Sequence, residues 1–184
     1  SMKLYSYWRS LATLRVRIAL NLKGVAYEQV IVDLAAGHQK QPGFKSVNPQ
    51  MVVPALDDGE GPVLFQSMAI LEFLEEKFPA PPLLPADARG RARVRGLAQI
   101  TVADTHPLIV PRVRNYLEKE LSLDEAARLA WIRHWIDAGL GAIEAHLVGE
   151  AETGRYCHGD QVTMADVCVV AQAIGYQAYE GNLA

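Results

Sequence analysis

The sequence lacks three features that would place the protein in a common class. Its 184 residues include only two cysteines, Cys157 and Cys168, which are too far apart for a CxxC motif. No apolar run reaches the roughly 18 residues that a membrane-spanning helix needs, and no signal-peptide pattern begins the chain. We therefore expect reduced thiols, a cytoplasmic protein without a membrane partner, and no redox chemistry by protein sulfur.

A surplus of positive charge is also missing. The formal net charge is −3, whereas nucleic-acid binders carry a basic surplus, so we expect no nucleic-acid partner. The densest basic run, residues 89–95, continues into a helical pattern, and we interpret it as a solvated or interface face of a helix rather than an anion site. None of the five histidines has the spacing of metal ligands, so we expect no metal.

The first eighty residues alternate between strand and helix patterns. Gly24 follows the first helical pattern as a C′ residue would, and Pro54 marks an edge strand or a special turn. The order β-α-β, then β-β-α, is the layout of an α/β thioredoxin-like domain. The patterns predict strands over 3–8, 27–34, 52–56 and 61–65, and helices over 12–23 and 66–78.

The second half of the sequence is helical throughout. A proline-rich linker, residues 80–87, separates an α/β domain over 2–79 from an all-α domain over 88–184. Helical patterns cover 88–118, 124–148 and 163–179. Thr163 and Asp166 have the spacing of a capping box at the start of the last helix. That helix is apolar nearly all round, which predicts the buried core helix of its domain.

Several of these features together resemble the cytosolic glutathione transferases: the element order, the proline of "VVPAL", the "QS" that opens the next helix, and the "TMAD" cap. The segments "YWRSxxxxRVRIALNLKG", "NPQxxVPAL" and "FQSMAILEFLEE" are similar to the zeta class, the maleylacetoacetate and maleylpyruvate isomerases. The resemblance spans essentially the whole chain. It implies a thioredoxin-like N-terminal domain, an all-α C-terminal domain, glutathione as cofactor, and a homodimer across the arginine-rich helix.

Ser10 is the catalytic residue that the resemblance implies, as the hydroxyl that donates to the sulfur of glutathione. It stands where a strand gives way to a helix, and a helix N-terminus favours anions. A free thiol has a pKa of about 8.5, and the thiolate is the nucleophile. A hydroxyl donor beside a helix N-terminus should lower that pKa. The alternative is that Ser10 is only an N-cap.

The resemblance also assigns glutathione contacts. A cis Val53–Pro54 bond would expose the backbone of Val53 to the cysteinyl unit, and the helix that begins near Ser67 would receive the γ-glutamyl carboxylate. Ser67 as a plain N-cap is the alternative, and a structural histidine is the alternative for His106, which would otherwise reach across the dimer. The implied glutathione-binding residues are His38, Gln39, Val53, Pro54, Gln66, Ser67 and His106.

The sequence departs from the zeta pattern at two places. Leu11 and Ala12 stand where the class has a second serine and a cysteine. Gln177 and Ala178 stand in the segment where the isomerases have an arginine for the substrate carboxylate. Leu11 removes a donor near the sulfur and makes the pocket more apolar. The resemblance also implies a further segment after Ala184 that covers the cleft.

The predicted function is therefore glutathione-dependent cis–trans isomerisation of a maleyl diketo acid, by thiolate addition, bond rotation and elimination. Arg9 and Arg112 are the candidate carboxylate anchors, and Leu11 is the candidate apolar contact. Leu11 and the missing arginine favour an alternative, a transferase that conjugates an apolar electrophile. A binding module without catalysis is a further alternative, and the retained glutathione-site residues argue against it.

Overall fold

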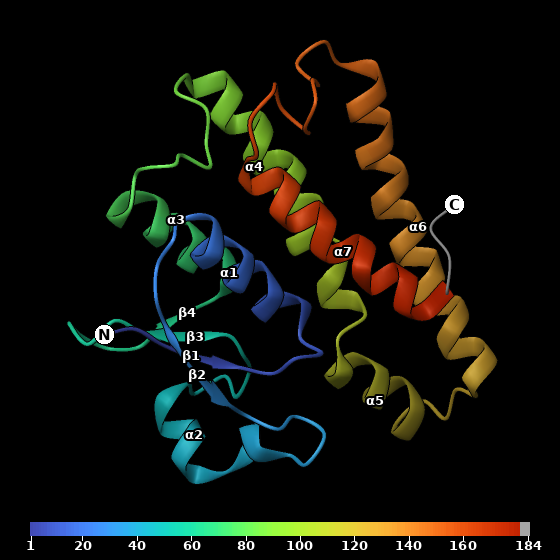
Figure 1. Cartoon of the computed structure of the whole chain (residues 1–184). Helices are drawn as coiled ribbons and strands as arrows, with labels where there is room; N and C mark the ends of the chain where they lie inside the picture. Colours follow the sequence, from blue (N-terminus) through green and yellow to red (C-terminus); the bar gives the residue numbers. More distant parts are fainter. Residues whose placement is uncertain (181–184) are drawn as a thin grey trace. The chain divides into compact units, whose positions relative to one another are not determined.

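The computed structural model describes the backbone of residues 1–180 and the side chains of residues 1–177. The chain forms two compact units, one over Ser1–Leu83 and one that begins at Leu84 (Figure 1). The first unit contains the sheet, and the described part of the second unit consists of helices and their connecting loops.

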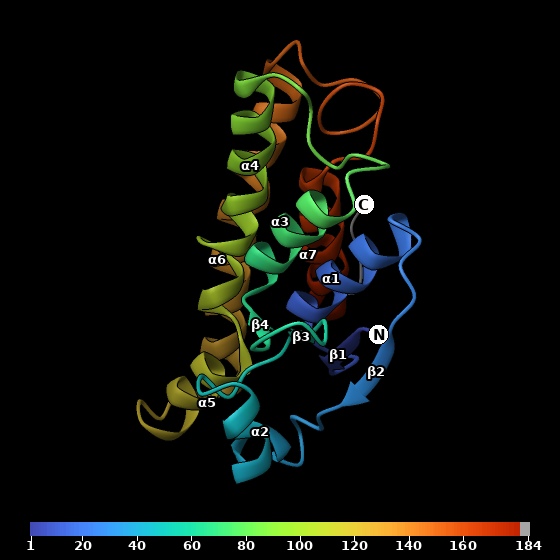
Figure 2. The same ribbon diagram turned by 90° about the vertical axis from the view of Figure 1, so that its left-hand side faces the viewer.

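The first unit is built on a four-stranded sheet of strand order β2-β1-β3-β4. Strands β1 and β2 pair in parallel, and the other two pairs are antiparallel. Helices α1 and α3 lie on one side of this sheet and α2 lies on the other (Figures 1 and 2). The bounds are β1 (Lys3–Ser6), α1 (Leu11–Leu22), β2 (Glu28–Ile31), α2 (Pro42–Val47), β3 (Ala55–Asp57), β4 (Leu64–Phe65) and α3 (Ser67–Lys77). This order confirms the predicted thioredoxin-like layout.

The α1 and α3 side of the sheet holds the main apolar core of the first unit. Apolar residues recur on one face of each helix, and that face is buried against the sheet, with Arg15 as the one charged residue among the buried residues of α1. Gly24 follows the end of α1 with φ = +67°, which confirms the predicted C′ position. The largest fully buried members of this core are Leu4, Val16, Leu20, Leu56, Ile70, Leu71 and Leu74.

Helix α2 covers the opposite side and is absent from the sequence prediction, which treated the region as an irregular polar segment. Its Phe44 is buried against Tyr5 of β1, with ring centroids 5.9 Å apart. Pro42 occupies the first turn of α2. Proline is preferred at the first helical position because its missing N–H is not needed there, so this proline begins a helix.

All four predicted strands are shorter in the structure, and the first two lose residues where they end. Strand β1 ends at Ser6 because the carbonyl of Tyr7 accepts the N–H of Ser10 at 3.0 Å, which turns the chain into α1. Strand β2 ends at Ile31, and a 3₁₀ turn, η1 (His38–Lys40), follows. Both corrections lengthen the loops at one end of the sheet.

The second unit consists of helices. Helices α4, α6 and α7 run side by side (Figure 1). A single helix over 88–118 was expected, and that prediction was wrong. The chain leaves α4 after Val102, and Pro107 and Pro111 open η2 and α5, because proline is favoured at a helix start and breaks a helix interior. The bounds are α4 (Ala88–Val102), η2 (His106–Leu108), α5 (Pro111–Lys119), α6 (Glu125–Gly149) and α7 (Met164–Glu180).

The start of α7 confirms the predicted capping box. The carboxylate of Asp166 accepts the N–H of Thr163 at 2.8 Å, and the hydroxyl of Thr163 accepts the N–H of Ala165 at 3.3 Å. The helix is not buried all round, however, since Val170 and Ile174 are about half exposed. Across the described residues, none of the helices combines the length and apolar character that crossing a membrane requires.

Candidate active site

The predicted site residues of the first unit gather at one edge of its sheet. Strands β1 and β2 run parallel, so both end at this edge. Strand β3 is antiparallel to β1 and therefore begins there, and β4 is antiparallel to β3 and ends there. Ser10 follows β1, His38 and Gln39 follow β2, Val53 and Pro54 precede β3, and Gln66 and Ser67 follow β4.

Ser10 is the N-cap of α1. Its hydroxyl oxygen accepts the backbone N–H of Thr13 at 3.1 Å. The capping alternative is thus part of the structure. Capping is compatible with the predicted catalytic role of Ser10, because a hydroxyl that accepts one hydrogen bond still has its own proton to donate to a sulfur. The side chain is half-buried at the positive end of α1, where a sulfur anion would be stabilised.

The residues on either side of Ser10 differ in character. Arg9 is exposed, and its guanidinium lies over the ring of Trp8 at 4.5 Å from the centroid. Trp8 is itself 70% exposed. Leu11 is half-buried in the first turn of α1. The sheet edge therefore presents a cation held on an aromatic ring next to the hydroxyl and an apolar side chain just beyond it.

A tight loop presents Val53 and Pro54, and the peptide bond between them is cis, as the resemblance implied. Asn48 holds this loop from within. Its side-chain amide donates to the carbonyl of Val52 at 2.8 Å, and its amide oxygen accepts the N–H of Gln50 at 3.1 Å. Asn48 is buried and was not assigned a role in the sequence, although an asparagine directly before a proline is a turn signal.

Gln66 stands directly before α3 in an unusual backbone conformation, with φ = +69°. Such conformations are costly for residues other than glycine, and they concentrate at functional sites. Its side chain does not cap the helix, and its amide instead donates to the oxygen of Gln50 at 2.8 Å. The N-terminus of α3 thus lacks a side-chain cap, and its first N–H groups suit a bound anion. The sequence prediction missed Gln50.

The remaining first-unit residues flank this arrangement. Ser67 is buried, and its hydroxyl oxygen accepts a hydrogen bond from Arg15 of α1 at 3.1 Å. His38 is exposed in η1, and Gln39 is half-buried beside it. Within the described part of the chain, the amide oxygen of Gln39 is buried without a hydrogen-bond partner. A bound polar ligand could satisfy that atom.

Three further residues named from the sequence lie in the second unit. His106 is half-buried in η2, Arg112 is exposed in the first turn of α5, and Gln177 is exposed on α7. Ala178 lies outside the residues whose side chains are described. The assignment of His106 to glutathione and of Arg112 to the substrate stays a prediction.

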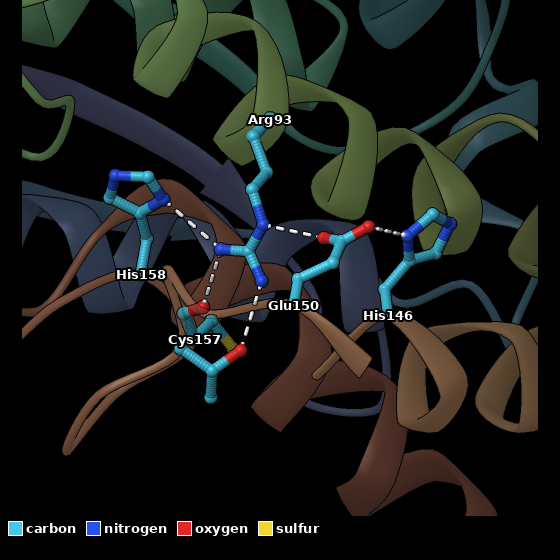
Figure 3. A network of polar contacts seen from close by, with 6 residues as sticks. Arg93, His146, Glu150, Cys157 and His158 are labelled. Carbon is cyan, nitrogen blue, oxygen red and sulfur yellow. Dashed lines mark hydrogen bonds and ion pairs between the residues drawn. The ribbon is translucent and has the colours of Figure 1, made fainter. Parts of the chain in front are cut away.

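The arginine-rich run of α4 is more than a solvated face. Figure 3 shows the guanidinium of Arg93 between the end of α6 and the loop before α7. Hydrogen bonds from His146 and then Arg93 lower the pKa of the Glu150 carboxyl below its ordinary value. This network ties three segments together and is structural. Arg93 contacts Glu150 at 2.7 Å, the Cys157 carbonyl at 2.8 Å, Thr153 at 3.0 Å and His158 at 3.0 Å.

Both cysteines are buried thiols that form no disulfide. Burial, followed by a hydrogen bond with Asp166, raises the pKa of the Cys157 thiol to about 12. That thiol is therefore protonated at neutral pH and cannot act as a nucleophile. Among residues 1–180, no group of three or more side chains has an arrangement that could hold a metal ion. A sulfur nucleophile at this site would have to come from a bound molecule.

The cysteines make a testable prediction. At pH 8 the folded protein should react only slowly with a thiol-specific disulfide reagent, because a pKa of about 12 leaves almost no thiolate at Cys157. In denaturant both thiols should titrate near the ordinary value of about 8.5 and react quickly. Absorbance of the released chromophore counts the thiols. Rapid labelling of the folded chain would contradict the burial of these side chains.

The comparisons with known proteins agree with this geometry. Residues 1–76 match the family model described as glutathione S-transferase, N-terminal domain. Over 182 residues the chain is 50% identical to a maleylpyruvate isomerase from a Ralstonia species, and the alignment covers 99% of this chain and 85% of that one.

Two solved structures are similar to the whole described fold. One is the holo structure of a maleylpyruvate isomerase, a bacterial zeta-class glutathione S-transferase, with a TM-score of 0.95 and 49% identity over 98% of this chain and 85% of that chain. The other is the maleylacetoacetate isomerase of Methylobacterium extorquens AM1 with bound malonate and GSH. It has a TM-score of 0.95 and 50% identity over 97% of this chain and 83% of that chain.

Proposed function

We propose, given that this chain belongs to the zeta class of the glutathione S-transferase family, that it is a glutathione-dependent cis–trans isomerase of a maleyl diketo acid, of the maleylpyruvate or maleylacetoacetate type. One observation carries the proposal most directly. The half-buried hydroxyl of Ser10, at the start of α1, and the N-terminus of α3, which has no side-chain cap, both lie at the same edge of the sheet. A thiol at the first and a carboxylate at the second would suit one glutathione molecule.

Glutathione supplies a thiol that, once ionised, adds to the cis double bond, permits rotation about the resulting single bond, and is eliminated again. The chain's part is to keep that sulfur ionised. Ser10 donates its hydroxyl proton toward the sulfur while its oxygen stays bonded to the N–H of Thr13. The positive end of the α1 dipole acts in the same direction. Both effects favour the charged form and so lower the pKa of the bound thiol.

The rest of the site holds the tripeptide in place. The start of α3, with Gln66 and Ser67, receives the γ-glutamyl carboxylate. The Val53–Pro54 turn faces the cysteinyl unit, and His38 and Gln39 approach the glycyl end. Gln50 supports Gln66 through their 2.8 Å hydrogen bond.

The substrate is a diacid and needs a cation. Arg9 fits that role because its guanidinium is exposed next to Ser10 and held on the Trp8 ring. A guanidinium binds a carboxylate through two parallel hydrogen bonds. Arg112 is the second candidate, from the second unit.

A comparison of turnover with two substrates tests this function. We expect the purified protein, supplied with glutathione, to convert maleylpyruvate to the fumaryl isomer and to conjugate chlorodinitrobenzene much more slowly. Loss of the maleyl absorbance reports the first reaction, and formation of the aromatic thioether reports the second. A protein that turns over only the aromatic substrate is not an isomerase.

One structural feature favours that second activity. Leu11 is half-buried in the first turn of α1, where the class has a second serine. A more apolar surface beside Ser10 suits an apolar electrophile. Conjugation of such a substrate is therefore the second candidate function.

The assembly and compartment follow from the same family. We infer a homodimer across the arginine-rich helix α4, whose Arg89 is exposed, and static light scattering distinguishes a dimer from a monomer. The two buried cysteines, which form no disulfide, support a reducing compartment such as the cytoplasm.

A further inference from the structure

We propose that Arg15 is a positioning residue of the glutathione site, which charges and orients the start of α3 from inside the protein. This inference rests on the proposed binding of glutathione. Arg15 is 2% exposed on α1, and its Nη1 atom donates to the hydroxyl oxygen of Ser67 at 3.1 Å. The two residues are 52 positions apart and come from adjacent helices.

The burial of this side chain calls for a reason. Arg15 lies on the face of α1 that also carries Val16, Ala19 and Leu20, all of which are fully buried. Moving a guanidinium out of water is expensive, and apolar residues of similar volume are often as stable or more stable at such positions. Arginine cannot lose its proton in a protein. Position 15 therefore places a permanent positive charge beneath the start of α3.

The hydrogen bond from Arg15 also determines which hydrogen bonds the hydroxyl of Ser67 can make. Because its oxygen accepts from Arg15, the hydroxyl proton of Ser67 is available for a different acceptor. The side chain is 4% exposed, at the surface end of α3 next to exposed Gln66. With Gln66 providing no side-chain cap, a carboxylate at this position can accept from the hydroxyl and from the first N–H groups of the helix.

Arg15 thus acts on the ligand through Ser67 and through its charge, without contacting the ligand. The charge adds to the positive end of the α3 dipole, which by itself attracts anions only weakly near the surface. The ligand group that senses Arg15 is the α-carboxylate of the γ-glutamyl residue. The sulfur belongs to the central cysteinyl residue, which Ser10 contacts at the start of α1.

A ligand that lacks only this carboxylate separates the role of Arg15 from a general effect on folding. Calorimetry would compare glutathione with γ-aminobutyryl-cysteinylglycine, in which a hydrogen replaces the α-carboxylate. The parent protein should prefer glutathione. In Arg15→Met this preference should fall on the order of tenfold, since hydrogen bonds to charged groups carry energies of that size. KM for glutathione should rise and kcat should change little.

Arg17→Met is the matched control, because Arg17 is a half-buried arginine on the same helix. It should keep the parental preference. If Arg15→Met does not fold, Arg15→Gln decides, since it keeps a donor for Ser67 without the charge and should show a reduced preference. An unchanged preference in the Arg15 variant, or an equal loss in Arg17→Met, would overturn the proposal. A parent that binds neither ligand would instead refute the proposed function.

Discussion

Replacing Ser10 with glycine should lower turnover of maleylpyruvate about 10- to 100-fold while glutathione affinity changes little, because one hydrogen bond to a charged sulfur is lost. Glycine is chosen because Ser10 also caps α1 through Thr13. Alanine at an N-cap costs about 1 kcal/mol of stability, whereas glycine costs only a few tenths. The glycine variant therefore removes the hydroxyl and leaves the helix start nearly intact.

The pH dependence of turnover provides a second test of the role of Ser10. A donor to the thiolate favours the charged form, so it lowers the pKa of the bound thiol, and its removal raises that pKa toward the free value of about 8.5. The activity of Ser10→Gly should accordingly recover as pH rises, in step with the ultraviolet absorption of the bound thiolate. Parental turnover with an unshifted profile would remove Ser10 from the chemistry and leave it as a cap alone.

Local signals allowed much of the first unit to be predicted. Gly24 ended α1 because only a residue tolerant of positive φ fits there, and Pro54 marked the turn before β3. Helix α2 was missed because its six residues are too few to show a helical period. In the second unit the apolar pattern continued through Pro107 and Pro111, which concealed the end of α4.

The candidate site depends on contacts that no local pattern contains. Ser67 was visible as the start of a helix, but its partner Arg15 lies 52 residues away and carries a charge on a face where periodicity predicts an apolar residue. Gln50 was part of a quoted motif, yet its pairing with Gln66 follows only from the register of β3 and β4. Sequence patterns located the segments, and the sheet topology brought them together.

The same kind of distant pairing governs the stability of the first unit. Lys23 follows the end of α1, its side chain is fully buried, and its ammonium group donates to Glu75 of α3 at 2.8 Å and to the carbonyl of Pro81 at 2.8 Å. The carboxylate of Glu75 also accepts the N–H of Leu83. One ion pair thus joins α1, α3 and the proline-rich segment.

Lys23→Met should lower the free energy of unfolding of the first unit by about 3–5 kcal/mol, because removing one partner leaves the Glu75 carboxylate, whose side chain is only 10% exposed, without its cation. Hydrogen exchange of the α1 and α3 amides measures this unit separately. Lys77→Met is the matched control. Its ion pair with Glu60 has the same 2.8 Å distance, but Glu60 is 71% exposed, so water screens the charges and the effect should be much smaller.

The double variant Lys23→Met/Glu75→Leu should recover most of the loss, since two apolar side chains can replace a buried pair. Equal effects of the two lysine substitutions would show that burial does not set the strength of this pair.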